Sequence, residues 1–233
     1  KRPGMGFAAI KYPEIEYGKA WESPYFGMAI HKGDWHWGAD RYREWRESHS
    51  YAMEPPLPKW FRESPGMVAH YDFKYQGGGV VHRFSDIPRL YDEAREMGLN
   101  HILISGWHVD GFDNGFPQYR PDPDLGTEEE LIAGIKYVRD LGGHVTFYIN
   151  SQLCNTKYGE RQTLIDEAAV RGLDGDIATA GYGDSESIEF AIMCSGAKAW
   201  QEHLKDTVYY LVDRIGIDGI YFDQLGMAPP QFC

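Results

Sequence analysis

The 233-residue chain carries 35 acidic and 23 basic side chains, so its formal net charge is −12 at pH 7. This excess argues against a nucleic-acid-binding protein, which needs clustered positive charge to neutralise phosphates. No run of about 18 apolar residues is present that could span a bilayer. With 42% hydrophobic and 25% charged residues, the composition is that of a folded globular chain, and the 15% aromatic content suits both a core and a sugar surface.

The ends of the chain and its cysteines bear on completeness and compartment. The three cysteines, Cys154, Cys194 and Cys233, form no C-x-x-C pair and are odd in number, so we expect buried or free thiols rather than a zinc site or a disulfide framework. Because the chain starts at Lys1 rather than at Met, we expect a piece of a longer protein. The compartment therefore stays open between secreted, periplasmic and cytoplasmic.

Residues 1–65 are predicted to form an irregular approach segment that packs on another part of the protein. They are rich in Pro, Gly and Trp and show no sustained period of 2 or 3.6 residues. One short helix is predicted over residues 39–48. The three prolines within residues 54–58 cannot continue it, since proline lacks the backbone donor and favours extended conformations before it.

From Gly66 onward the sequence alternates between strand and helix patterns. Thr127 and Glu130 form a capping box before one helix, and Gly216 stands where a left-handed cap would end another. The region between residues 150 and 191 is predicted to be a long excursion with one helix and a Gly/Asp/Ser loop near residues 174–187. The predicted strands cover residues 67–71, 101–105, 145–149 and 219–222, and the predicted helices cover residues 86–97, 127–141, 164–171 and 200–215.

Two architectures fit this alternation: a doubly wound open sheet and a (β/α)8 barrel, both with parallel strands. Gly77-Gly78-Gly79 lacks the G-x-G-x-x-G spacing of a nucleotide-binding sheet, and no helix follows it directly. Polar or aromatic residues instead follow every strand, at the end where a barrel carries its active site. Four strand–helix units of about 40 residues each are half of what a barrel needs. We therefore predict an α/β fold, the N-terminal half of a TIM barrel over residues 66–233, truncated, after the approach segment.

Asp223 is the leading catalytic candidate because it ends the last predicted strand. A carboxylate held there on rigid backbone could attack an anomeric carbon or stabilise an oxocarbenium ion. The alternative is an aspartate that caps the following turn. Further candidates for contacts with a sugar are the aromatic and hydrogen-bonding side chains at the strand ends. These are Trp107, His108, Asp110, Asp113, Asn150, Gln224 and Asp72.

Competing explanations exist for several of these residues. Asp-Gly and Asn-Gly in the loop after residue 106 are also turn formers. The H-x-D spacing of His108 and Asp110 is a weak metal signal with no third ligand in register, so we expect no metal and no cofactor. A non-catalytic carbohydrate-binding barrel and a metal-dependent hydrolase remain as alternatives to a glycosidase.

Several segments together resemble bacterial glycoside-hydrolase-like barrels, many of them uncharacterised. The resemblance rests on Gly106-Trp107, on Pro121 to Gly126, on Met193-Cys194 through Trp200-Gln201, and on the closing run from Gly216 to Gln224. These proteins are similar to the endo-α-N-acetylgalactosaminidase group and, more distantly, to α-galactosidase-type retaining enzymes. The resemblance covers most of the chain from Asp34 onward.

The resemblance implies a (β/α)8 catalytic domain preceded by a β-sandwich, with the acid that closes the fourth strand as the nucleophile. By position that residue is Asp223. The acid/base residue would come from a later strand, outside this chain, so we expect this fragment alone to be inactive. The implied partners are an oligosaccharide or glycoside substrate and the missing C-terminal half of the barrel, with no nucleic acid and no membrane span.

Overall fold

The computed structural model describes residue 13 and residues 15–49, 56–71, 73–157, 159–181 and 188–225. The chain divides into two compact units, one of residues 11–63 and one that contains the residues from Ser64 onward. The assignment of residues 1–65 to an approach segment and of residues 66–233 to a truncated barrel domain stays a prediction.

The unit of residues 11–63 contains two helices, α1 (His36–Ser48) and α2 (Lys59–Glu63). Helix α1 begins three residues before the predicted range and two positions after Asp34, whose carboxylate accepts a hydrogen bond from the His36 backbone N–H at 3.0 Å. Neither helix contains a buried residue. Their stability therefore has to come from contacts other than a core of their own.

The second unit is built on a four-stranded parallel sheet, and all four predicted strands are confirmed. The strands lie in the order β1-β2-β3-β7, which is the sequential order of a barrel. Tyr148 pairs with Tyr221 and Asn150 pairs with Asp223 across β3 and β7. Paired residues of parallel strands point to the same face of a sheet. The strands are β1 (Val68–His70), β2 (His101–Ile104), β3 (His144–Asn150) and β7 (Gly219–Asp223).

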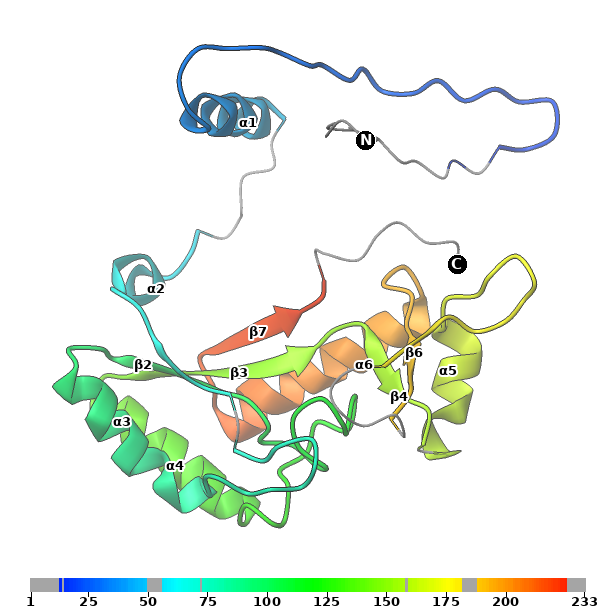
Figure 1. Cartoon of the computed structure of the whole chain (residues 1–233). Helices are drawn as coiled ribbons and strands as arrows, with labels where there is room; N and C mark the ends of the chain where they lie inside the picture. Colours follow the sequence, from blue (N-terminus) through cyan, green and yellow to red (C-terminus); the bar gives the residue numbers. More distant parts are fainter. Residues whose placement is uncertain are drawn as a thin grey trace, which may run out of the picture. The chain divides into compact units, whose positions relative to one another are not determined.

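The helices that connect these strands lie on one face of the sheet (Figure 1). The predicted capping box begins α4, where the Glu130 N–H donates to the Thr127 hydroxyl and the Thr127 N–H donates to the Glu130 carboxylate. Helix α6 widens into the π-helical turn η3, and Gly216 ends it with φ of 87°, as predicted. The elements are η1 (Phe84–Asp86), α3 (Ile87–Glu96), α4 (Glu128–Asp140), α6 (Lys198–Tyr209) and η3 (Tyr210–Ile215).

The main core lies between this sheet and helices α3 and α4, which contribute Ile87, Leu90, Leu131, Ile135 and Val138. Close helix packing explains one glycine in α4. A Cβ at Gly134 would approach Ile87 to between 3.0 and 3.3 Å, so a side chain there would push the two helices apart. The parallel sheet with helices on one face is the fold class predicted from the sequence.

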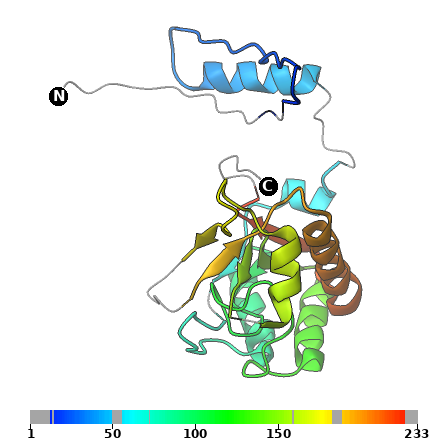
Figure 2. The ribbon, with the colours of Figure 1, turned by 90° about the vertical axis from the view of Figure 1, so that its right-hand side faces the viewer.

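The predicted excursion between β3 and α6 contains a second, antiparallel sheet of order β4-β6-β5, which was not predicted from the sequence. Its strands are only two or three residues long, too short for an alternating pattern to show. Helix α5 packs beside it around Ile165 and Trp200, and Figure 2 shows α5 next to α6. The elements are β4 (Leu153–Asn155), η2 (Gly159–Arg161), α5 (Gln162–Ala168), β5 (Thr179–Ala180) and β6 (Phe190–Ile192).

The cysteines differ in state. Cys154 is free and buried, and burial raises the pKa of its thiol to about 12, so it stays protonated and unreactive at neutral pH. Cys194 is disulfide-bonded, which corrects the expectation of free thiols. Spacing in the sequence did not reveal the bond because pairing depends on distance in the fold. Cys233 lies outside the described residues.

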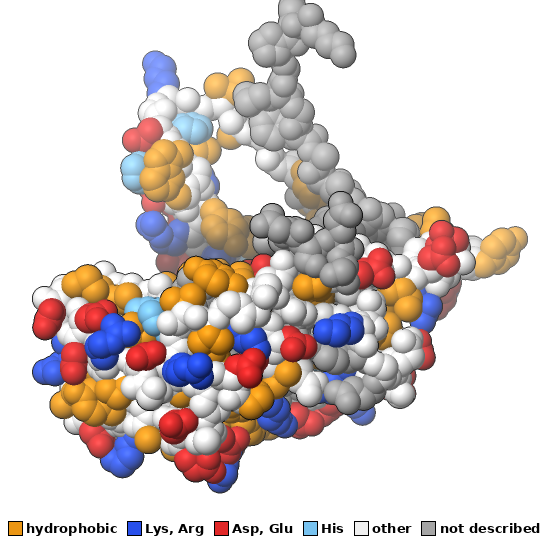
Figure 3. Space-filling view, turned by 60° about the horizontal axis from the view of Figure 1, so that its bottom comes forward, with side chains coloured by type: hydrophobic (Ala, Val, Ile, Leu, Met, Phe, Trp, Pro, Cys, Tyr) orange, Lys and Arg blue, Asp and Glu red, His pale blue; other side chains and the backbone are white. Residues whose placement is uncertain are grey.

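The helices and the charged surface bear on whether the chain could enter a membrane or bind nucleic acid. Within the described ranges, no helix combines the length and the apolar character needed to cross a membrane. On the face of the second unit that Figure 3 brings forward, acidic and basic side chains alternate without a broad basic patch. The expectation that the chain binds no nucleic acid stays a prediction.

Candidate functional site

Asp223 is the last residue of β7, at the carboxyl end of the parallel sheet. Phe222 next to it lines an apolar hollow together with α6, so Asp223 points to the sheet face that the helices leave free. Its Oδ2 accepts a hydrogen bond of 2.6 Å from the Tyr148 hydroxyl. Its backbone carbonyl accepts bonds from both the N–H and the hydroxyl of Ser151. The carboxylate is therefore held on rigid backbone and oriented by one short charge-assisted bond.

An aromatic wall adjoins this carboxylate. The Tyr148 ring stacks with Tyr221 at a centroid distance of 5.6 Å and contacts Phe112 at 5.2 Å. Tyr71 lies 6.3 Å from Tyr148 and 5.8 Å from Phe112. Tyr71 and Tyr221 are 46% and 41% exposed, so they offer ring faces to a ligand beside Asp223.

Asp113 is a second carboxylate at this site, brought in by the loop after β2. Burial and, to a lesser extent, the charge of Asp223 raise its pKa to about 6. Gln76, in the segment after β1, holds this loop in place because its side-chain amide donates to the Asp113 carbonyl at 2.7 Å. Burial, then the hydrogen bond and charge of Asp223, also raise the pKa of the Tyr148 hydroxyl, with a smaller effect from Asp113. The two carboxylates and Tyr148 thus form one electrostatic cluster.

Asp113 leads to a pH prediction. Because its pKa is raised to about 6 in the folded chain, the folded state binds this proton more tightly than the unfolded state. The resulting stability is fully present below the unfolded pKa near 3.8 and is lost as the pH rises through 6. In urea denaturation, the free energy of unfolding of Asp113→Asn should therefore depend less on pH across this window than that of the wild type. Equal slopes for the variant and the wild type would contradict the prediction.

Trp107 and His108 are core residues in the structure, and both are 0% exposed. The Trp107 indole N–H donates to the Tyr148 carbonyl at 3.0 Å, and its ring packs on Phe147 at 4.6 Å. Burial lowers the pKa of His108 to about 4, so its ring is neutral at pH 7. This placement corrects the expectation that either side chain faces a sugar, because both are packed in the core beside the loop.

Asn150 is 1% exposed, and its side-chain oxygen accepts the backbone N–H groups of Gln152 and Leu153, both at 2.9 Å. It therefore shapes the turn after β3, a structural role that the sequence did not distinguish from ligand binding. Gln224 and Asp110 are half-buried and adopt positive φ values of 63° and 66°. Both remain candidate contacts. Asp72 lies outside the described residues.

A buried ion pair positions the loop that carries Asp110 and Asp113. Lys74, which follows β1, donates from Nζ to Asp122 Oδ2 and Asp124 Oδ2, both at 2.8 Å. Asp122 also accepts the backbone N–H groups of Asp110 and Asp124. The Lys74 backbone lies so close that a Cβ at Gly106 would come within 2.6 Å of its carbonyl oxygen. Glycine at positive φ of 66° allows this approach.

Two features of the site were not predicted from the sequence: Tyr148, and the ion pairs of Lys74 with Asp122 and Asp124, which we call the Lys74 clamp. Tyr148 precedes Asn150 by two positions on one strand, so strand periodicity could have placed both on the same face. No local pattern could have revealed the pairing of Lys74 with Asp122, because 48 positions of sequence separate them.

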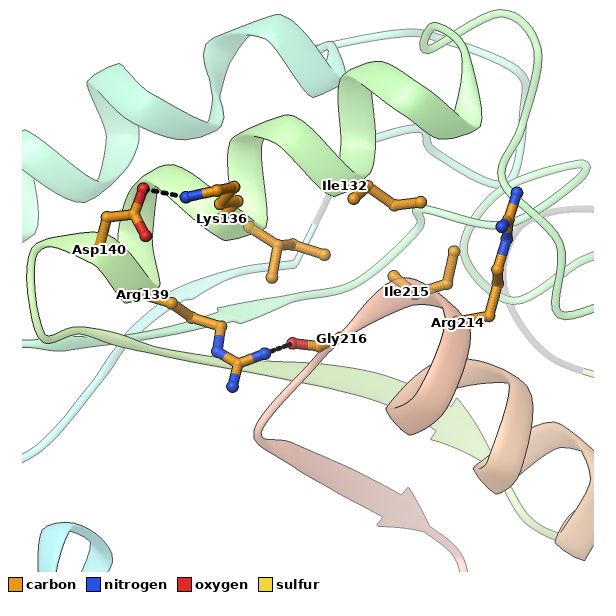
Figure 4. A pocket seen from close by; sticks show the side chains of 8 residues that line it. Ile132, Lys136, Arg139, Asp140, Arg214, Ile215 and Gly216 are labelled. Carbon is orange, nitrogen blue, oxygen red and sulfur yellow. Dashed lines mark hydrogen bonds and ion pairs between the residues drawn. The ribbon is translucent and has the colours of Figure 1, made fainter.

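Other hollows lie away from this cluster. Figure 4 shows one of about 500 Å³ between α4 and η3, lined by Ile132, Lys136, Arg139, Asp140, Arg214 and Ile215 among others. It reaches Gly216, just before β7 begins, and so lies at the amino ends of the strands, where barrels carry stability rather than catalysis. Its cations have partners: Lys136 pairs with Asp140, Arg139 donates to the Gly216 carbonyl and Arg214 pairs with Glu128.

A metal site would need several His, Cys, Asp or Glu side chains close together. Within the parts of the chain that the structure describes, no group of three or more His, Cys, Asp or Glu side chains converges as metal ligands would. The metal-dependent alternative therefore finds no donor set there.

Together, the sequential parallel strands and the helices on one face of the sheet define an α/β fold of the kind found in TIM-barrel domains. Comparison with known proteins agrees. The chain belongs to the family described as "Domain of unknown function (DUF6259)", which matches residues 22–233. A protein of Bacteroides thetaiotaomicron described as "Putative glycoside hydrolase" is 30% identical over 128 residues, 54% of this chain and 18% of that protein. The chain thus spans less than a fifth of this relative.

Solved structures show the same fold. The α-N-acetylgalactosaminidase NagBb of Bifidobacterium bifidum superposes with a TM-score of 0.59 at 15% identity, covering 83% of this chain and 33% of that one. An α-amylase of Geobacillus thermoleovorans has a TM-score of 0.54 at 14% identity, covering 74% and 42%. The α-galactosidase of Thermus thermophilus has a TM-score of 0.52 at 15% identity, covering 68% and 30%. The resemblance to glycosidase barrels inferred from the sequence is confirmed.

Proposed function

We propose that this chain supplies the nucleophile side of the active site of a retaining glycoside hydrolase. The observation that carries the proposal is Asp223, a carboxylate at the carboxyl end of β7 that is held by the Tyr148 hydroxyl at 2.6 Å. The curated relative described as a glycoside hydrolase and the glycosidase folds support the reaction class. The protein's substrates, in this proposal, are glycosides or oligosaccharides.

In the proposed mechanism, Asp223 attacks through its carboxylate. Tyr148 occupies Oδ2, which leaves Oδ1 as the attacking atom. The Oδ1 lone pair forms a bond to the anomeric carbon while the bond from that carbon to the leaving oxygen breaks. A carboxylic acid outside this chain protonates the leaving oxygen and then deprotonates the water that cleaves the glycosyl ester. In such enzymes the two carboxyl groups lie about 5–5.5 Å apart.

The remaining contacts in the proposal are for binding. Asp113, which is half protonated near pH 6, can donate or accept a hydrogen bond to a sugar hydroxyl. Tyr71 and Tyr221 present partly exposed rings to the C–H face of a sugar. Gln224 and Asp110 remain proposed contacts, whereas Trp107, His108 and Asn150 support the site without facing the ligand.

Covalent trapping tests this proposal directly. The full-length protein is incubated with 5-fluoroglycosyl fluorides of galactose, N-acetylgalactosamine and glucose, since the names of the relatives point to such sugars. We expect one glycosyl unit to be added, and peptide mass spectrometry should locate it on Asp223. Turnover with a label on another carboxylate would contradict the assignment, and glycan binding without any turnover would favour a non-catalytic carbohydrate-binding barrel.

A further inference from the structure

A small polar pocket of about 280 Å³ lies between the loop after β2 and helix α6. It belongs neither to the Asp223 cluster nor to the hollow of Figure 4. The loop contributes residues 117–120, η2 contributes Arg161, and α6 contributes His203, Asp206 and Thr207. All these segments belong to the same compact unit of the chain.

Two arginines in this pocket have no carboxylate partner. Arg161 donates from Nη2 to the Gln118 side-chain oxygen at 3.0 Å. Arg120 donates to the Tyr119 carbonyl at 3.0 Å, and its guanidinium lies 3.9 Å from the centre of the Tyr210 ring. Neither forms an ion pair with any described residue, in a chain whose acidic side chains outnumber its basic ones. Neutral groups thus orient both guanidinium groups, and the nearby carboxylates of Glu128 and Asp206 act on them only through space.

Buried nitrogen atoms in the same pocket lack hydrogen-bond partners. Arg161 Nε and His203 Nε2 are both fully shielded and unpaired. Leaving such a group unsatisfied carries a desolvation penalty, so a protein normally supplies a partner for it. The His203 ring is fixed by stacking on Trp200 at 5.5 Å. When the His203 ring is protonated, Nε2 becomes a donor next to a guanidinium and needs an acceptor from outside the chain.

We propose that this pocket binds a small oxyanion, a carboxylate or sulfate group carried by a hydroxylated ligand such as a sugar acid or a sugar sulfate. Arg161 supplies Nε–H and the guanidinium charge, and Arg120 adds charge at the rim. Protonated His203 donates from Nε2. The exposed Asp206 carboxylate also lines the pocket and would repel a bare anion, so it favours a ligand with a hydroxyl group on that side.

The charges around His203 influence its pKa, so binding of an anion can be observed as a change in that pKa. Burial lowers the pKa of His203, and the positive charges of Arg161 and Arg120 act in the same direction. A hydrogen bond to the Pro117 backbone and the charge of Asp206 oppose them. An anion bound at Nε2 should raise the pKa of His203 by linkage. The inference does not depend on the proposed glycosidase activity.

Histidine-selective NMR of the chain tests the proposal. Galacturonate, glucuronate, galactose 6-sulfate and inorganic sulfate are titrated at constant ionic strength, with galactose as the neutral control. We expect the anions to shift the His203 resonances and raise its pKa while galactose does not. Tighter binding of uronates would identify a sugar acid, and tighter binding of galactose 6-sulfate would identify a sugar sulfate; both support the site.

Two matched variants separate the pocket from overall charge. Arg161→Gln should weaken anion binding at least about tenfold, which corresponds to loss of one charge-assisted contact. Arg171→Gln removes the same charge from an exposed arginine that bonds only backbone carbonyls and should keep wild-type affinity. Circular dichroism confirms that each variant is folded. Equal weakening in both variants, inorganic sulfate binding better than every sugar anion, or no His203 response to any anion would overturn the proposal.

Discussion

Asp223→Asn should lower kcat on an aryl glycoside by on the order of 10³-fold or more, because an amide cannot form the glycosyl ester. The substitution keeps the shape of the side chain, and the amide oxygen can still accept the hydrogen bond from Tyr148. Folding should therefore be little affected. The measurement is steady-state kinetics on the full-length protein, since the proposal places the acid/base on a later strand.

The control for this result is Asp213→Asn, which removes a carboxylate from an exposed position on η3. It should leave kcat within about twofold of wild type. A second variant, Asp223→Gly, opens space for an external nucleophile. Azide should restore turnover in it and give a glycosyl azide of inverted anomeric configuration, as direct displacement requires. A kcat for Asp223→Asn within a few-fold of wild type would refute the nucleophile assignment.

Lys74→Met should destabilise the folded chain by about 3–5 kcal/mol, because it leaves Asp122 charged and without its ion-pair partner in the interior. The side chains of Lys74 and Asp122 are only 9% and 2% exposed. Lys136→Met removes an exposed lysine paired with Asp140 on α4 and is the matched control. We expect that variant to cost less than about 1 kcal/mol. Urea denaturation measures both, and a similar small loss for the two variants would contradict the clamp.

The ion pairs of Lys74 with Asp122 and Asp124 also predict that the free energy of unfolding depends on pH in two ranges, one alkaline and one acidic. Burial lowers the pKa of Lys74, but its hydrogen bonds to Asp122 and Asp124 outweigh this and raise it overall. The corresponding stability is present below the usual lysine pKa and is lost as the pH rises through the raised value. The hydrogen bond from Lys74 lowers the pKa of Asp124, so that contribution is present above the usual carboxyl pKa and is lost as the pH falls. Lys74→Met should remove both dependences.

The predicted elements that matched best are those whose signals are local. The capping box at Thr127 and Glu130 and the left-handed Gly216 depend on a few neighbouring residues, and both occur as predicted. The strands of the parallel sheet were also recognisable as short apolar runs. Of these, β2 and β3 are buried on both faces, whereas β1 and β7 are only partly buried. The three short antiparallel strands of the excursion were not recognisable, because a strand of two or three residues is defined by its partner rather than by its own sequence.

In the candidate site, too, the sequence predicted local features, whereas the fold decided the features that depend on distant segments. The sequence predicted Asp223, Asn150 and Trp107 as candidates because each lies at or just after the end of a strand. It could not distinguish which of them faces a ligand. Burial separates them: Trp107 and Asn150 are at most 1% exposed and bond to the backbone, whereas Asp223 is half-buried and has a side-chain donor. Burial depends on which distant segments cover a residue, and that information is not local.

The sequence by itself determined the parallel strand–helix architecture, the count of four units and the place of Asp223 at a strand end, because hydrophobic periodicity and cap residues act over a few positions. Only the tertiary structure decided that Asp113 lies in the electrostatic field of Asp223, that Tyr148 orients the carboxylate and that Lys74 anchors the loop. Each of these contacts joins residues that are dozens of positions apart, and it forms only because parallel strands bring their carboxyl ends to one edge of the sheet.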